Sequence, residues 1–287
     1  MIYNYNFDKG LSYGNIGDYI QSLAALQYLP KNCKPYLINR DEVGYYHGEK
    51  VKLIFNSWNN FYRGNKNISD KITPIYISYH IRKNYALPSV YINNLKKYAP
   101  IGCRDKATRD NFIKYGINAY FSSCLTTTLD IDYAVKDKER TNEIIFVDNK
   151  FGDYHAADKF LYSLKAYNLD KTNITYISHD FKLILSHIER FKLAKLLLNK
   201  YVRAKLVIST RIHGALPCLA FKTPVILINK AFDYDRLPGL YELLNTIGQN
   251  YERKFEIRVN LDKNGIVYNS KNYLKYANKL KKRLKFI

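Results

Sequence analysis

Short apolar runs alternate with longer amphipathic stretches along most of this chain. Runs of three to five mainly apolar residues, suited to strands buried on both faces, stand at 51–55, 75–79, 100–103, 119–123, 143–147, 174–177, 206–208 and 225–228. Stretches with helical periodicity or composition lie between them, at 18–29, 105–115, 156–167, 186–201 and 215–221. This alternation predicts an α/β fold with parallel sheets.

Helix starts are marked by polar residues with capping chemistry. Asp18 with Gln21, and Ser186 with Glu189, have the spacing of capping boxes, in which each side chain bonds a backbone N–H of the first turn. Asp105 stands where it can cap the helix expected at 105–115.

A polar, charged stretch at 135–142 divides the pattern into two α/β series. We therefore predict an N-terminal α/β domain at 1–135, a C-terminal α/β domain at 143–270 and a basic helix at 271–287. Since parallel sheets bind ligands beyond the carboxyl ends of their strands, side chains that follow the apolar runs are the first candidates for a site.

The strongest candidates lie in the stretch 204–229, which reads as strand, loop, short helix and strand. Arg211, His213 and Gly214 fall where the strand passes into the helix. A guanidinium can grip a phosphate or carboxylate, an imidazole can move a proton near neutral pH, and a helix N-terminus offers unpaired N–H groups. The pattern predicts an anion-binding site with an acid/base, although a surface loop that binds nothing is the alternative.

Other strand ends supply weaker candidates. His179 follows the run 174–177. His80 and Arg82 follow the run 75–79, Asn15 lies in a glycine-rich turn, and Trp58 lies in a polar loop suited to a sugar surface. A role in ligand binding is one reading of these residues, while a plain turn residue for Asn15 and a buried loop anchor for Trp58 remain open.

The chain is strongly basic, with 46 Lys and Arg against 25 Asp and Glu and a net charge of +21. This excess indicates an acidic partner, although a bias toward A/T-rich codons would also supply lysines. Specific nucleic-acid binding is not expected, because no helix-turn-helix, zinc-finger or RNP pattern occurs.

The four cysteines lack the spacing of metal ligands, which favours reduced thiols and no metal site. Since no signal peptide or bilayer-length apolar run occurs either, we expect a cytoplasmic protein.

The C-terminal stretch predicts an amphipathic helix. Its apolar stripe is Tyr273, Ala277, Leu280 and Leu284, and its opposite side is basic. Either the stripe packs on a domain and leaves a solvated basic face, or that face, with Lys275, Lys279, Lys282 and Arg283, lies against the anionic inner face of a membrane.

Three segments in order resemble the polysaccharide pyruvyl transferases. They are Tyr-Gly-Asn-Ile-Gly-Asp-Tyr-Ile-Gln-Ser-Leu-Ala-Ala near the N-terminus, Gly-Cys-Arg-Asp-Lys-Ala-Thr with Ser-Ser-Cys-Leu-Thr-Thr-Thr, and Ser-Thr-Arg-Ile-His-Gly-Ala-Leu-Pro-Cys-Leu-Ala with Thr-Pro-Val-Ile. The resemblance implies two Rossmann-like domains facing across a cleft, as in GT-B glycosyltransferases. It also implies transfer of pyruvate from phosphoenolpyruvate to two hydroxyls of a sugar, without metal or cofactor. By the same resemblance Arg211 and His213 contact the donor, and Arg104 matches a further donor arginine. For such a reaction we also expect Gly214 and His179 on the donor side. The residues expected to contact the acceptor are Asn15, Trp58 and His80.

The chemistry of that reaction suits these residues. Phosphoenolpyruvate carries a phosphate and a carboxylate, which arginines bind well. Its methylene carbon must gain a proton and a sugar hydroxyl must lose one, roles that we assign to His213 and Asp18. The expected acceptor is a glycan or a lipid-linked sugar. A GT-B glycosyltransferase with a nucleotide-sugar donor and a basic nucleic-acid-binding protein are the rival hypotheses.

Overall fold

The protein is a mixed α/β fold with parallel strands, as the alternating pattern predicts. The computed structural model describes residues 2–3, 13–30, 32–33, 35, 37–58, 67–81, 86–130, 140–148, 155–167, 169, 173–182, 185–229, 237–249 and 254–285. Most of the expected boundary stretch, 135–142, lies outside these residues. Among them, no helix combines the length and the apolar content needed to cross a membrane.

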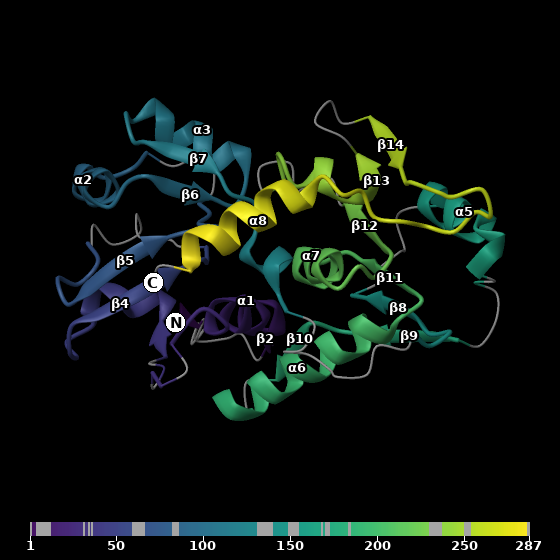
Figure 1. The fold of residues 1–287 in the computed structure, drawn as a ribbon, viewed down its shortest axis with the longest axis horizontal. Helices are drawn as coiled ribbons and strands as arrows, with labels where there is room; N and C mark the ends of the chain where they lie inside the picture. Colours follow the sequence, from purple (N-terminus) through teal and green to yellow (C-terminus); the bar gives the residue numbers. More distant parts are fainter. Residues whose placement is uncertain are drawn as a thin grey trace.

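The C-terminal half is built on a six-stranded sheet in the order β14-β13-β12-β11-β8-β9, parallel except for β14 (Figure 1). Its central strands are buried along their whole length, which explains their continuous apolar runs. The strands are β8 (Ile144–Val147), β9 (Ile174–Ile177), β11 (Leu206–Ser209), β12 (Val225–Asn229), β13 (Asn245–Gln249) and β14 (Phe255–Arg258).

The strand order of this sheet changes direction between β8 and β11. The chain passes from β8 to β9 on one side, then returns across β8 to β11 on the other. The helices α5 (His155–Ser163), α6 (His187–Arg203) and α7 (Ile212–Ala220) belong to this half. In open α/β sheets such a switch point leaves a crevice outside the carboxyl ends of the two strands, where ligands bind.

The N-terminal half contains three parallel strand pairs, β1 with β3, β4 with β5 and β6 with β7. A parallel bridge between Tyr79 and Cys103 joins the last two pairs. The elements are β1 (Ile2–Tyr3), β3 (Ile38–Asn39), the 3-10 helix η1 (Arg40–Tyr45), β4 (Val51–Phe55), β5 (Ile72–Tyr76), α2 (Ser89–Lys97), β6 (Ile101–Cys103), α3 (Lys106–Lys114), β7 (Ala119–Phe121) and the 3-10 helix η3 (Leu125–Thr128).

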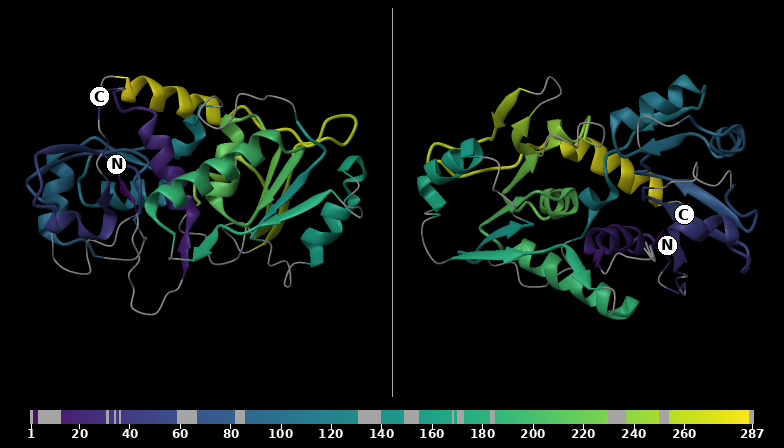
Figure 2. Two further views of the ribbon diagram at one scale, coloured as in Figure 1. Left: turned by 90° about the horizontal axis from the view of Figure 1, so that it is seen from below. Right: turned by 180° about the vertical axis from the view of Figure 1, so that it is seen from behind.

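Two helices join the halves. Helix α1 (Ile16–Leu26) belongs to the N-terminal sequence but packs on α6, α7 and η3, and β2 (Tyr13–Asn15) pairs with β10 (Asp180–Lys182). Helix α8 (Tyr273–Leu284) runs back from the C-terminal half to η3 and β7 (Figures 1 and 2). One hydrophobic cluster includes residues of β4, η3, α1, α7 and α8, so the halves share a core. The limits of the two expected domains stay a prediction.

The apolar stripe expected on α8 is confirmed, because Tyr273, Ala277, Leu280 and Leu284 are all buried. The sequence predicts a buried apolar side for α6 as well, and that prediction is wrong in part; its residues are Ile188, Phe191, Leu193, Leu196 and Leu197. Ile188 and Leu196 are 69% and 53% exposed. Helix α6 instead buries the face that meets α1, with Ala194, Leu198 and Tyr201 in the shared core.

Several expected boundaries are also wrong. Helix α7 begins at Ile212 rather than at 215, and α5 ends at Ser163 rather than at 167. The strand expected at 75–79 is β5 at Ile72–Tyr76, because it pairs with β4 in the register Val51 to Ile72 and Ser78 then turns to φ 55°. Helix α1 begins at Ile16 rather than after Asp18, because the side chain of Asn15 caps it.

Candidate active site at the strand switch point

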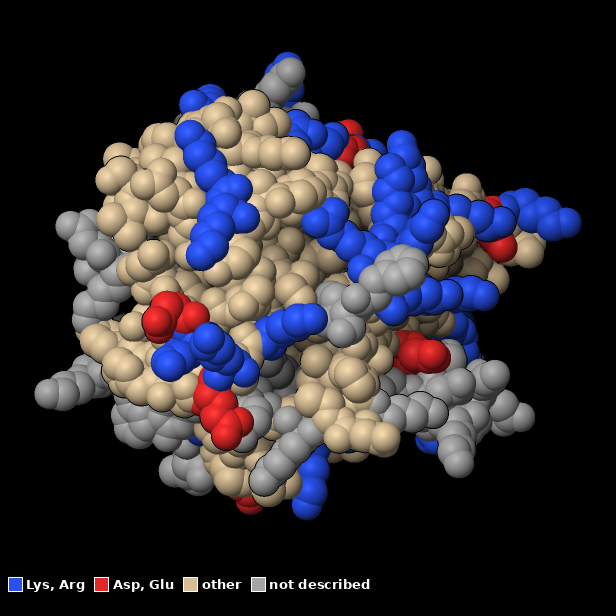
Figure 3. Space-filling view, turned by 60° about the vertical axis from the view of Figure 1, so that its left-hand side comes forward, with Lys and Arg blue, Asp and Glu red and all other residues tan. Residues whose placement is uncertain are grey.

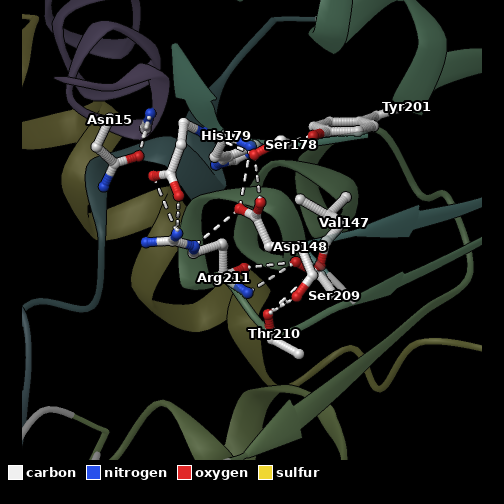
Figure 4. A network of polar contacts seen from close by, with 11 residues as sticks. Asn15, Val147, Asp148, Ser178, His179, Tyr201, Ser209, Thr210 and Arg211 are labelled. Atoms are coloured by element: carbon white, nitrogen blue, oxygen red, sulfur yellow. Dashed lines mark hydrogen bonds and ion pairs between the residues drawn. The ribbon is translucent and has the colours of Figure 1, made fainter. Parts of the chain in front are cut away.

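Arg211 and two aspartates form an ion-pair network at the switch point of the C-terminal sheet. Arg211 follows β11 and Asp148 follows β8, its neighbour in the sheet. The Nε of Arg211 donates to Asp148 Oδ2 at 2.8 Å, and its Nη2 donates to both Asp180 oxygens at 3.0 and 2.9 Å (Figure 4). The two carboxylates therefore fix the direction of the guanidinium.

Asp148 also ties together the ends of three strands. Its carboxylate accepts hydrogen bonds from the Ser178 hydroxyl at 2.6 Å and from the His179 backbone N–H at 3.0 Å. Its carbonyl accepts a hydrogen bond from the hydroxyl of Thr210 at 2.8 Å. The side chain of Asp148 is only 10% exposed, and these contacts fix its orientation.

Strained backbone occurs at the carboxyl ends of strands in both halves. Asp148 has φ 50°, Ser78 beyond β5 has φ 55°, and Ser123 beyond β7 has φ 66°. A non-glycine residue in this left-handed region costs about 1–3 kcal/mol, and such residues cluster at active sites. The strain marks the same strand ends at which the sequence places its candidate residues.

His213 lies where the N-termini of α1 and α7 meet. It occupies the first turn of α7 and is 7% exposed. A Cβ on Gly17 of α1 would lie 3.0 Å from His213 Nδ1, so the backbone of α1 passes directly against the imidazole. The side chain of Asn15 caps α1 by accepting from Gly17 N at 2.9 Å. Helix α1 thus closes one side of the site.

Gly214 allows the close approach of α7 to the end of β11. A Cβ at this position would lie 2.4 Å from the hydroxyl oxygen of Ser209. That hydroxyl accepts from the Arg211 backbone N–H at 3.0 Å and donates to the Arg211 carbonyl at 2.8 Å. Gly214 and Ser209 therefore fix the backbone of Arg211. This close approach by itself explains why the position holds glycine, whether or not Gly214 also contacts a donor.

His179 is a buried residue beneath this network. Its Nε2 lies 2.7 Å from the Tyr201 hydroxyl, and its carbonyl accepts from Ile16 N at the start of α1. Burial, and secondarily the Arg211 cation, lower the pKa of His179 to about 4 against the opposing effect of Asp148. The imidazole is therefore neutral near pH 7, so any contact with an anionic donor would be a neutral hydrogen bond.

Arg104 and His80 occupy the strand ends of the N-terminal half. Both are buried, and His80 Nδ1 lies 2.5 Å from Asp105 Oδ2. Asp105 caps α3 through Thr108 N, as expected from the sequence. Arg104 Nε lies 3.9 Å from Asp105 Oδ2. Burial raises the pKa of the Cys124 thiol, and the Arg104 guanidinium opposes this effect.

Asp18 and Trp58 are linked through an arginine that sequence reasoning missed. Arg40 Nη1 lies 3.6 Å from Asp18 Oδ1, and the Arg40 guanidinium lies 5.2 Å from the centre of the Trp58 ring. The side chain of Asp18 is 16% exposed, whereas that of Arg40 is 4% exposed. This group joins the first turn of α1 to η1 and to the residues that follow β4.

The structure thus gathers Asn15, His179, Arg211, His213 and Gly214 around the switch point. Trp58, His80 and Arg104 lie at strand ends of the other half, and Arg82 lies outside the described residues. The sequence patterns did not mark Asp148 or Asp180 as site residues. Asp148 directly follows the apolar run 143–147, and a position after an apolar run is the signal that identified Arg211. Within the described ranges no three His, Cys, Asp or Glu side chains form a group that could hold a metal.

Comparisons with known proteins bear on the fold and on the family. A functionally uncharacterised protein from Klebsiella pneumoniae, KP1_0663, has a similar fold, with a TM-score of 0.50 and 16% identity over 84% of this chain and 86% of that chain. No protein with curated annotation matches the sequence. The sequence model of the polysaccharide pyruvyl transferases matches residues 15–229, from the cap of α1 to the end of β12. The chain belongs to the polysaccharide pyruvyl transferase family.

Proposed function

We propose that this protein transfers pyruvate from phosphoenolpyruvate to two hydroxyls of a sugar in a cell-surface polysaccharide precursor, forming a ketal and releasing phosphate. The observation that carries the proposal is the pair of Arg211 and His213 at the strand switch point, beside the N-terminus of α7. Family membership supports the same reaction class.

Arg211 is the donor-binding group in this proposal. Its side chain is 36% exposed, and its two carboxylate partners differ in burial, at 10% for Asp148 and 47% for Asp180. An incoming phosphate or carboxylate replaces the exposed Asp180 at Nη2, while Asp148 keeps Nε and hence the orientation. The N-terminus of α7 adds backbone N–H groups and the positive end of its dipole. Arg104 supplies the second cation for a donor with two anionic groups.

The reaction needs one proton delivered and two removed. His213 protonates the methylene carbon of the enol, which makes the adjacent carbon electrophilic, and the first sugar hydroxyl bonds to that carbon. The C–O bond to phosphate then breaks, and the second hydroxyl closes the ketal. The two sugar hydroxyls lose one proton each. One of these protons returns to His213, which gave its own to the methylene carbon, and the other leaves with phosphate. Asp18, beside Arg40, is the base assigned to the acceptor.

We further propose that the two halves form a GT-B-like pair of Rossmann-like units, with the acceptor on the side of residues 1–135 and the donor on the side of 143–270. Parallel strands in both halves, joined through α1 and α8, support this arrangement. The acceptor contacts assigned to Asn15, Trp58 and His80 belong to it. The proposal includes a cytoplasmic location, no metal and no resident cofactor, with phosphoenolpyruvate as co-substrate.

A donor screen tests the function. Phosphoenolpyruvate is expected to raise the melting temperature and to release inorganic phosphate when a suitable sugar is present. Nucleotide sugars serve as the comparison, with release of nucleotide as the readout. Release of nucleotide from a nucleotide sugar, without any response to phosphoenolpyruvate, would instead establish a glycosyltransferase.

A further inference from the structure

A cavity of about 380 Å³ lies between β7 and α8. Its lining includes Ser122, directly after β7, and Leu280 of the buried α8 stripe. The Ser122 hydroxyl donates to the carbonyls of Cys103 and Ser123 and accepts from the Ser78 backbone N–H. The cavity therefore adjoins the strained strand ends of the N-terminal half, and the size suits a small ligand. We call it the α8 pocket.

Aromatic rings line the α8 pocket. Phe121 and Tyr276 meet edge to face, with ring centres 4.8 Å apart. Tyr120 adds a third ring, and its hydroxyl is buried without a hydrogen-bond partner among the described residues. Aromatic faces with hydroxyls nearby are suited to the C–H faces of a sugar ring.

Three cations complete the lining. Lys279, Lys282 and Arg283 come from consecutive turns of α8, and no described lining residue is acidic. Lys279 and Lys282 are three residues apart and exposed, so both can reach one ligand. Arg283 is held in place, because its guanidinium lies 5.1 Å from the Tyr120 ring centre and donates to the Pro100 carbonyl at 3.2 Å. Cations also outnumber acids on the face of the molecule in Figure 3.

We propose that the α8 pocket binds the anionic part of the acceptor, and that this acceptor is a phosphorylated saccharide. One cavity is lined both by aromatic rings, which suit a sugar, and by cations, which suit a phosphate. A ligand that contains both groups would match this lining. The proposal rests on the proposed transfer to a sugar and adds a negative charge to its acceptor. The same cations could meet the phosphate of a lipid headgroup, so the test includes that source.

Calorimetric titration of the full chain tests this inference with N-acetylglucosamine 1-phosphate, N-acetylglucosamine and inorganic phosphate. The expected result is that the sugar phosphate binds at least tenfold more tightly than either fragment. The variant Lys279→Ala/Lys282→Ala should weaken that binding tenfold or more and leave phosphoenolpyruvate binding unchanged. The matched control is Lys281→Ala/Lys285→Ala, which removes two cations of the same helix outside this lining. It should bind as the wild type does.

Three results would overturn the inference. Equal weakening by both double variants, or equal affinity for the sugar phosphate and inorganic phosphate, would reduce the effect to general electrostatic attraction. Co-sedimentation with vesicles containing phosphatidylglycerol but not with neutral vesicles, without sugar-phosphate binding, would assign the cations to a membrane surface. Binding of phosphoenolpyruvate by the wild type, measured separately, shows whether the donor site has failed rather than this pocket.

Discussion

The guanidinium of Arg211 takes its direction from Asp148, whose Oδ2 lies 2.8 Å from Nε (Figure 4). These two residues follow neighbouring strands, β11 and β8, and Asp148 is further fixed by His179 N and the Ser178 hydroxyl. A donor that binds Arg211 therefore meets a cation already oriented by the sheet. Preorganisation of this kind lowers the cost of binding, since less side-chain freedom is lost.

Asp148→Asn should raise the KM for phosphoenolpyruvate roughly 10- to 100-fold, because a shielded hydrogen bond to a charged group contributes about 1.5–3 kcal/mol. Asp180→Asn is the matched control, since it also removes one negative charge beside Arg211. It should leave KM unchanged or lower it, because Asp180 is the partner that the donor displaces. Steady-state kinetics of both variants decide the point, and equal increases in KM would argue against distinct roles.

Gly17→Ala should slow turnover about tenfold or more while changing the melting temperature little. The new methyl would lie 3.0 Å from His213 Nδ1 and displace the imidazole, and misplacement of a catalytic group is costly. Alanine is otherwise favourable within a helix. In a His213→Ala background the same substitution should have no further effect on kcat. An additive loss in the double variant would show that Gly17 acts by another route.

Stability should fall as the pH drops from about 6.5 toward 4. The pKa of His179 in the folded protein is about 4, below its ordinary value, so in this window the unfolded chain takes up a proton that the folded protein does not. His187, whose pKa burial and Arg190 also lower, contributes in the same direction. His179→Gln should flatten this part of the profile in urea unfolding at several pH values. A wild-type stability independent of pH across the window would contradict the prediction.

Chelation should leave the activity unchanged. The proposed reaction uses Arg211 and Arg104 for the anionic donor and His213 for the proton, and no step depends on a metal. Phosphate release is measured after dialysis against EDTA and again after addition of Mg²⁺ or Mn²⁺. Loss with the chelator and rescue by either ion would require a metal in the donor site.

Local patterns in the sequence located the strands that carry the site. The runs 51–55, 174–177 and 206–208 match β4, β9 and β11 within one residue. Capping by Ser186 with Glu189 at the start of α6 is confirmed as well. These features depend on neighbours within a few positions, so a single sequence carries them.

Other features depend on partners far along the chain. The exposed side of α6 and the place of α1 in the C-terminal half follow from the packing of α1 on α6, which periodicity alone does not specify. The pairing of Arg211 with Asp148 needs the order of β8 and β11 in the sheet. Because Asp148 follows an apolar run, the sequence could have marked it as a candidate. Only the pairing of β8 with β11 shows that Asp148 faces Arg211.

Titration of the purified protein with phosphoenolpyruvate tests most directly whether Arg211 binds the donor. We expect saturable binding by the wild type and a loss of about 2–5 kcal/mol in Arg211→Ala, the usual cost of removing one member of a buried charge pair. His213→Ala should bind within a few-fold of the wild type while its turnover falls on the order of a hundredfold or more. Wild-type binding by Arg211→Ala together with wild-type turnover by His213→Ala would show that neither residue belongs to the donor site.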